Sequence, residues 1–135
     1  MTPQRIQRKR TKGWKSPANT IYVGRPTKWG NPFRVVQMSD GEWSVKTDGS
    51  EWCTEILIKF GHAVYPSKES AIKDAVAMYG YWLIPYEHGD NMSKFYISIS
   101  NLEEAIQNLK GKNLSCFCPL DQPCHADILL KLANI

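Results

Sequence analysis

The stretch LSCFCPLDQPCHADILLKLAN, residues 114–134, holds the features that decide how the end of the chain folds. Its first five residues, LSCFC (114–118), form a short apolar run that is typical of a buried strand. Two prolines break the next segment, and a helix is predicted to start at residues 121–123 with an apolar face of Ile128, Leu129, Leu132 and Ile135. A strand, a loop and a helix in this order indicate a domain in which helices pack on a sheet.

The remaining sequence predicts elements of both kinds. Strands are predicted at 20–23, 33–37 and 43–47, and helices at 68–84 and between Ser100 and Gly111. The second and third of these strands flank a turn and should form a β-hairpin. Residues 52–60 fit a strand or a short helix, and residues 95–100 fit a strand or an extended lead-in.

These elements predict the fold class. We expect an α/β (or α+β) fold, a single small domain with a mixed sheet, a β-hairpin near the N-terminus and about three helices. A length of 135 residues suits one domain with its own core. We place this domain at residues 19–135, preceded by a basic N-terminal arm at residues 1–18.

The charge is distributed unevenly along the chain. Residues 1–39 contain nine of the 17 Lys and Arg residues and none of the 13 Asp and Glu residues, so they carry +9 and the remainder −5. The nine are Arg5, Arg8, Lys9, Arg10, Lys12, Lys15, Arg25, Lys28 and Arg34. Such a block favours a phosphate-bearing partner, although it also fits an arm that only keeps the protein soluble. Trp14 within it could stack on a base.

Two classes of protein are excluded by the apolar pattern. No apolar run approaches the length of a transmembrane helix, so we expect no membrane contact. The N-terminus also lacks the apolar core of a secretory signal, and we therefore expect a cytoplasmic protein. In that compartment the four cysteines should be thiols or metal ligands, and not disulfides.

The loop after the first predicted strand, GRPTKWGNPF (24–33), has the chemistry of a ligand-binding loop. Arg25 and Lys28 could bind phosphate, Trp29 could stack on a base, and Asn31 could donate a hydrogen bond to a ligand. Pro26 and Pro32 would stiffen the loop. The alternative is a rigid structural turn in which Trp29 packs inward.

The pattern C-x-C-x5-C-H-x-D after the last predicted strand has three interpretations. A metal site would use Cys116, Cys118, Cys124 and His125, with zinc as the natural ion. Against it, alternation along a strand should point Cys116 and Cys118 to opposite faces. Adjacent Cys124 and His125 also rarely reach one ion without a bend in the backbone.

In the second interpretation the start of the last helix is a reactive or ligand-binding site. The helix N-terminus would lower the pKa of Cys124, His125 would act as a general acid or base, and Asp127 would orient it. In the third, Cys116 and Cys118 are buried apolar residues and Asp127 only stabilises the helix dipole. We prefer the second interpretation for His125 and Asp127, with no metal or other cofactor.

Three segments together, RIQRKRTKGWKSP (5–17), YVGRPTKWGNPF (22–33) and LSCFCPLDQPCHADILLKLAN, resemble a family of bacterial and phage proteins described as a domain of unknown function. The resemblance spans nearly the whole chain. It implies that the basic arm and both loops belong to one signature, and hence that the arm is part of the site.

The leading functional hypothesis is a crevice between loop 24–32 and the start of the last helix that binds a nucleotide or a nucleic-acid end. Its expected phosphate-binding and stacking residues are Arg8, Lys9, Arg10, Lys12, Arg25, Lys28, Trp29 and Asn31, and its catalytic residues would be His125, Asp127 and Cys124. Such a site could process a nucleotide or glycosidic bond, and whether the protein is an enzyme stays open. The alternatives are a non-catalytic nucleic-acid-binding protein with a structural zinc, and a phage protein that contacts a host protein.

Overall fold

The computed structural model describes residues 2–83 and 102–135, which belong to two compact units. Unit 1 comprises residues 1–30 and 101–135, and unit 2 comprises residues 31–100. The predicted loop at 87–93 and the segment 95–100 lie outside the described residues.

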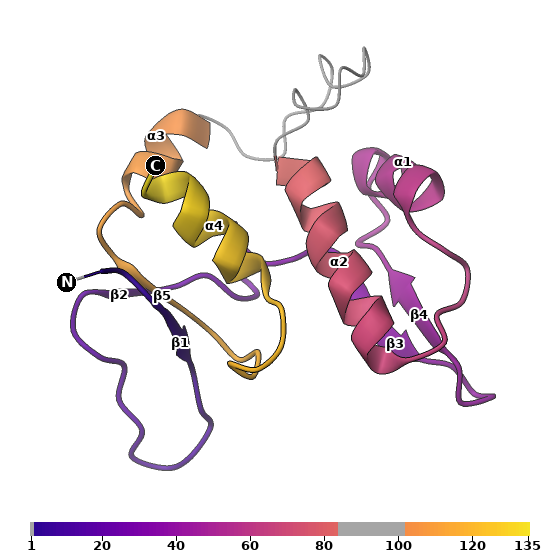
Figure 1. Cartoon of the computed structure of the whole chain (residues 1–135), viewed down its shortest axis with the longest axis horizontal. Coiled ribbons are helices and arrows are strands. Elements are labelled where there is room, and N and C mark those ends of the chain that lie inside the picture. The colour runs from indigo at the N-terminus through magenta and orange to yellow at the C-terminus, as the bar shows by residue number, and fades with distance from the viewer. Residues whose placement is uncertain (1, 84–101) are drawn as a thin grey trace. The chain divides into compact units, whose positions relative to one another are not determined.

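Unit 1 is built on a three-stranded parallel sheet. Its strands are β1 (Arg5–Gln7), β2 (Thr20–Tyr22) and β5 (Asn113–Cys116), in the order β1-β5-β2 (Figure 1). Both edge strands align with the centre of β5, where Ser115 is the partner of Ile6 on one side and Tyr22 on the other. Parallel pairing places the loops that follow β1, β2 and β5 at the same end of the sheet.

Helix α4 (His125–Ala133) covers one face of this sheet, in contact with β5 and β1. The shorter α3 (Leu102–Gln107) packs against α4. Leu114 of β5 and Ala126 and Leu129 of α4 are completely buried. The i, i+3 spacing of Ala126 and Leu129 puts them on one side of the helix, which explains why that side faces the sheet.

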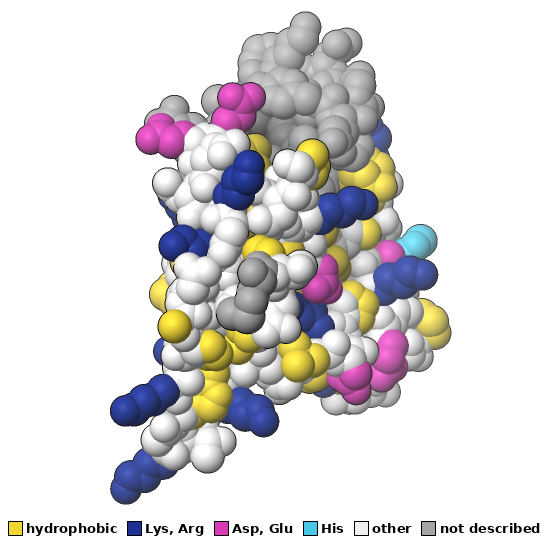
Figure 2. All heavy atoms as spheres, turned by 60° about the vertical axis from the view of Figure 1, so that its left-hand side comes forward, with side chains coloured by type: hydrophobic (Ala, Val, Ile, Leu, Met, Phe, Trp, Pro, Cys, Tyr) yellow, Lys and Arg dark blue, Asp and Glu magenta, His cyan; other side chains and the backbone are white. Residues whose placement is uncertain are grey.

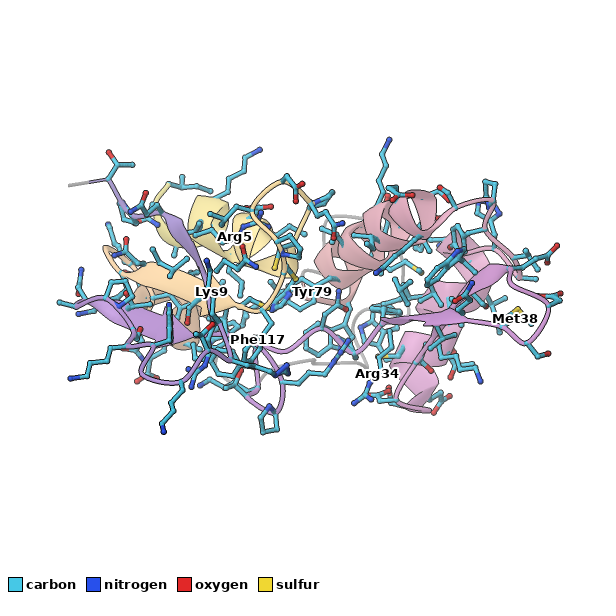
Figure 3. All side chains as sticks on the ribbon, turned by 90° about the horizontal axis from the view of Figure 1, so that it is seen from below. Arg5, Lys9, Arg34, Met38, Tyr79 and Phe117 are labelled. Atoms are coloured by element: carbon cyan, nitrogen blue, oxygen red, sulfur yellow. The ribbon has the colours of Figure 1, made fainter. Side chains whose placement is uncertain are left out.

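The two faces of the parallel sheet carry different side chains. Arg5 lies on the α4 side, where it contacts Asp127. Arg8, Tyr22 and Phe117 interact with one another on the opposite side. Figure 3 shows this separation, with Arg5 beside α4 and Phe117 across the sheet from it. Alternation of side chains along a strand produces the two-sided arrangement.

Unit 2 contains the predicted hairpin and two helices. Strands β3 (Arg34–Gln37) and β4 (Trp43–Lys46) pair antiparallel, and both contact α2 (Lys68–Leu83), which also packs against α1 (Glu51–Phe60). Ser50 caps α1, since its hydroxyl accepts a hydrogen bond from Cys53 N. The core of the unit consists of Phe33, Val45, Cys53, Ile56, Tyr65, Ala71, Ala75 and Met78.

The fold class is confirmed as α+β, with a β-hairpin and, in the described part of the chain, four helices. The strands form two separate sheets, whereas one mixed sheet was expected. Residues 5–7, within the expected arm, form β1, and the ambiguous segment 52–60 is helical. Among the described residues, no helix combines the length and apolarity needed to span a bilayer.

Candidate functional site

Three cysteines and one histidine converge at the end of the parallel sheet in unit 1. The Sγ atoms of Cys116 and Cys118 lie 3.7 Å apart, and Cys124 Sγ lies 3.6 Å from His125 Nδ1. The ligand atoms of Cys116, Cys124 and His125 are all within 4.8 Å of one another. We call these four residues the thiol–imidazole cluster. Cys116, Cys124 and His125 are buried, and Cys118 is half-buried.

The prediction that Cys116 and Cys118 point to opposite faces is wrong. Strand β5 ends at Cys116, so the alternation that would have separated the two thiols does not continue to Cys118. Neighbouring Cys124 and His125 also approach each other closely. Cys124 is the N-cap, with an extended backbone (φ −147°, ψ 149°), and His125 is the first residue of α4. This change from extended to helical backbone provides the bend that the sequence did not reveal.

The imidazole of His125 is held in one orientation by the backbone of a different segment. Its Nε2 lies 2.8 Å from the carbonyl oxygen of Val23, the residue directly before loop 24–32. A carbonyl can only accept, so Nε2 carries the proton. Burial lowers the pKa of His125, which keeps the ring neutral and leaves Nδ1 without a proton on the side of Cys124.

The thiols of the cluster change one another's acidity. The pKa of Cys116 is lowered because the Cys118 and Cys124 thiols donate hydrogen bonds to its thiolate. The pKa of Cys118 and that of Cys124 are raised, chiefly by the same hydrogen bonds to Cys116. The three thiols therefore titrate as one coupled group. The raised pKa of Cys124 is the reverse of the activated nucleophile that the sequence suggested.

Arg5 donates hydrogen bonds to the loop between Cys118 and Cys124. Its Nη2 donates to the carbonyl oxygens of Pro119, Leu120 and Gln122, at 3.1, 2.9 and 2.7 Å, and its Nη1 lies 3.1 Å from Asp127 Oδ2. The same Asp127 oxygen accepts a hydrogen bond from Cys124 N. Asp127 therefore caps α4 and binds Arg5. The Arg5 side chain is only 9% exposed.

The loop after β2 is fixed internally by short hydrogen bonds. Thr27 donates from its hydroxyl and its backbone N–H to the carbonyl of Gly24, and Tyr22 Oη donates to the carbonyl of Arg25 at 2.6 Å. A Cβ on Gly24 would lie 2.5 Å from Tyr22 Oη, so the Tyr22 side chain approaches the backbone closely at this glycine. The Arg25–Pro26 peptide bond is cis.

Of the residues in this loop that were expected to bind a ligand, two are exposed and two are buried. Arg25 and Lys28 are exposed, and Lys28 Nζ lies 5.5 Å from the centre of the Trp29 ring. Trp29 is only 4% exposed, so its ring is not presented to a ligand in solution. Asn31 belongs to unit 2, where its buried side chain accepts from Phe33 N and donates to the Ala75 carbonyl. These contacts give Asn31 a structural role in unit 2, and its role in ligand binding stays a prediction.

A second group of side chains lies on the face of the sheet away from α4. The guanidinium of Arg8 is 4.8 Å from the ring centre of Tyr22, 5.8 Å from that of Phe117 and 5.9 Å from that of Trp14. Arg10 lies over Phe117 at 4.1 Å, and Tyr22 meets Phe117 edge to face. We call Arg8, Arg10, Trp14, Tyr22 and Phe117 the cation–aromatic cluster.

The loop between β1 and β2, which carries Arg8, Arg10 and Trp14 of this cluster, also bears exposed positive charge. Lys9, Lys12 and Lys15 are exposed, as is Arg10. Figure 2 shows Lys and Arg side chains projecting at the lower end of the molecule, where Figure 1 places this loop, with hydrophobic side chains between them. The predicted phosphate-binding residues Arg8, Lys9, Arg10 and Lys12 are therefore gathered in one part of unit 1.

Sequence reasoning missed three residues of this unit. Arg5 was counted only as one charge of the arm, and its role as a half-buried donor depends on strand β1, which the sequence did not predict. Tyr22 and Phe117 were read as parts of strands, without a role in binding. Their alternation with Val23 and Cys116, which face α4, was the available signal that they lie on the opposite face.

Comparison with curated proteins found no match, and neither did comparison with solved structures. A family model does match, and it covers residues 6–135, from strand β1 through the loop after β2 to the thiol–imidazole cluster and α4. The chain therefore belongs to the family described as Domain of unknown function (DUF4326).

Proposed function

We propose that the protein binds nucleic acid, single strands in preference to duplexes, through the cation–aromatic cluster and the lysines around it. The observation that supports this most directly is the position of Arg8, whose guanidinium lies within 4.8–5.9 Å of three aromatic ring centres. Arg10 repeats the arrangement over Phe117. Cations interleaved with aromatic rings are typical of surfaces that bind unstacked bases and their phosphates.

The chemistry of each component fits this ligand. A guanidinium held against a ring keeps N–H groups with which to bind phosphate oxygens, and arginine does so in a bidentate manner. Base stacking on aromatic side chains contributes about 1–3 kcal/mol per base, and bases in a duplex cannot reach such rings. Exposed Lys9, Lys12 and Lys15 add a sequence-independent attraction to the backbone.

A catalytic role for His125, Cys124 and Asp127 receives less support than binding does. His125 and Cys124 are buried, and Asp127 is engaged by Arg5 and by Cys124 N. A group that transfers protons to a substrate must come within hydrogen-bond reach of it. We therefore favour the non-catalytic form of the hypothesis, in which exposed Arg25 and Lys28 are further contacts for phosphate. We place this activity in the cytoplasm.

The proposal is tested by fluorescence anisotropy with a labelled single strand of about 20 nucleotides and with its duplex, over a series of salt concentrations. The triple variant Lys9→Ala, Lys12→Ala, Lys15→Ala should bind more weakly. On a single strand each phosphate contact contributes about 0.7 to the slope of log K against log salt, so the slope should become shallower by about 2.

The matched control removes three exposed lysines from elsewhere, Lys46→Ala, Lys73→Ala and Lys110→Ala, and changes the net charge equally. It should leave the slope nearly unchanged. Equal effects of the two triple variants would contradict a defined binding surface. Tighter binding of duplex, or of mononucleotides with no gain from a longer strand, would also refute the proposal. Capture of a protein partner in place of nucleic acid would support the host-protein alternative.

A further inference from the structure

The thiol–imidazole cluster of unit 1 has no role in the proposed binding of nucleic acid, and its geometry leads to a separate conclusion. Cys116 comes from the end of β5, Cys118 from the turn that follows, and Cys124 and His125 from the start of α4. The separation of 3.7 Å between Cys116 Sγ and Cys118 Sγ is far longer than a disulfide bond of about 2.05 Å. All four cysteines of the chain are free.

Two distances within the cluster match those between ligands of one tetrahedral ion. With Zn–S bonds of about 2.3 Å and Zn–N bonds of about 2.0–2.1 Å, tetrahedral angles place two sulfur ligands about 3.8 Å apart. The same geometry places a sulfur and a nitrogen ligand about 3.6 Å apart. The structure has 3.7 Å between Cys116 Sγ and Cys118 Sγ, and 3.6 Å between Cys124 Sγ and His125 Nδ1.

The histidine is oriented as a metal ligand would be. Its Nε2–H donates to the carbonyl of Val23 at 2.8 Å, which leaves the lone pair of Nδ1 directed toward the thiols. Ligating histidines commonly donate their other N–H to a carbonyl or carboxylate, which fixes the tautomer and the ring plane. This contact is an observation independent of the sulfur distances, and it comes from a segment 102 residues away in sequence.

The loop that carries the ligands is also held in place from outside. Arg5 binds three of its carbonyl groups, and Asp127 holds the backbone N–H of Cys124. The conformation that brings Cys118 toward Cys116 and Cys124 is therefore supported by hydrogen bonds besides those within the cluster. Such supporting contacts orient the ligands of metal sites.

We propose that Cys116, Cys118, Cys124 and His125 bind one zinc ion in a Cys3His site that joins the end of β5 to the start of α4. A ligand set of three thiolates and one imidazole favours zinc, whereas carboxylate and carbonyl oxygens would suit magnesium or calcium. Four protein ligands in a mostly buried position leave no coordination site for a substrate. The ion is therefore structural, and it stabilises the sheet end from which the cation–aromatic cluster extends.

The test starts with elemental analysis of the full chain, purified under reducing conditions without added chelator. One zinc per chain is expected. Zinc is then removed and the protein titrated with Co²⁺, which reports geometry. A tetrahedral site with three sulfur ligands gives intense visible d–d bands and thiolate-to-cobalt charge transfer, and added Zn²⁺ should abolish both.

The variants Cys118→Ser and Cys124→Ser should weaken zinc binding at least tenfold. The control Cys53→Ala removes a buried cysteine of unit 2 and should retain one zinc per chain. If the cluster variants fail to fold, the Co²⁺ spectrum of the unaltered protein still shows whether the cluster binds a metal ion tetrahedrally. Folded protein without zinc and without a tetrahedral Co²⁺ spectrum would overturn the proposal, as would stoichiometric iron or a Cys116–Cys118 disulfide found by mass spectrometry.

Discussion

Arg5 Nη1 and Asp127 Oδ2 are 3.1 Å apart although 122 residues separate them in sequence. This pair ties the first strand of the chain to the first turn of its last helix. The same guanidinium also donates hydrogen bonds to the carbonyls of Pro119, Leu120 and Gln122. Among the described residues, few other backbone hydrogen bonds hold this loop. A residue counted at first as one charge of a basic arm thereby determines the conformation of the cysteine loop.

We predict that Arg5→Ala lowers the free energy of unfolding by about 2–3 kcal/mol, because hydrogen bonds from a charged donor to several acceptors are lost together. Arg5→Lys should restore only part of this loss, since an ammonium group cannot reproduce the planar fork of the guanidinium. Urea denaturation measures both effects. The control Arg34→Ala, at an exposed position of β3, should change stability by less than about 0.5 kcal/mol. If the two variants proved equally stable, Arg5 would be an ordinary surface cation.

Asn31 allows a test that separates a structural from a ligand-binding role. Its side chain bonds to Phe33 N at 2.9 Å and to the Ala75 carbonyl at 3.2 Å, in a buried part of unit 2. Asn31→Ala should destabilise the protein by about 1–3 kcal/mol, because buried polar groups of the backbone lose their partner. The dissociation constant for a single strand should change less than twofold. A fivefold loss of affinity with unchanged stability would support the ligand-binding role predicted from the sequence.

Ser115 occupies the centre of β5, and its hydroxyl oxygen is buried without a hydrogen-bond partner in the described part of the structure. Burying an unpaired hydroxyl costs free energy, so Ser115→Ala should be neutral or should raise stability by about 1 kcal/mol. The comparison is Ser44→Ala, which removes a hydroxyl that donates to the Ala63 carbonyl at 3.0 Å and should cost about 1 kcal/mol. Thermal denaturation measures whether each variant is more or less stable than the unaltered protein. A clear loss of stability in Ser115→Ala would mean that the hydroxyl has a partner in solution.

Local sequence patterns predicted the elements whose stability is local. The helix expected at 68–84 is observed at Lys68–Leu83, and the expected hairpin is formed by β3 and β4. Apolar periodicity and turn residues are enough for such elements. Strand β1 has only three residues, and it exists because β5 offers it a partner more than a hundred positions later. No window of sequence around Arg5 contains that information.

In the candidate sites, too, local sequence predicted some features, and the pairing of distant strands determined the others. The loops after β2 and β5 were predicted to form a ligand-binding site because they contain cationic, aromatic, thiol and imidazole side chains. The predicted separation of Cys116 from Cys118 was wrong because it assumed a strand two residues longer than β5. The convergence of thiols with His125, and the gathering of Tyr22, Phe117 and Trp14 around Arg8, depend on parallel pairing of strands. Pairing between distant segments cannot be read from spacing along the chain.

Metal removal should affect the two units unequally if the zinc proposal is correct. In unit 1 the ion would connect β5 with α4, whereas the hairpin β3–β4 has no ligand in the cluster. Chelation should lower the melting temperature, because a ligand present at about 1,000 times its dissociation constant stabilises by about 4 kcal/mol. Hydrogen exchange measured by mass spectrometry should then show faster exchange in peptides that contain residues 113–118 and 124–128. Peptides that cover β3 and β4 should exchange as before.

Readdition of Zn²⁺ should restore protection in those unit 1 peptides, and Mg²⁺ at the same concentration should not, because thiolate ligands discriminate against hard cations. The Cys53→Ala protein provides the internal reference, since its cluster is intact and its response to chelator should match that of the unaltered chain. Uniform loss of protection across both units would indicate that chelation acts by global unfolding. An unchanged exchange pattern would show that the thiol–imidazole cluster holds its conformation through the hydrogen bonds of Arg5 and Asp127 alone.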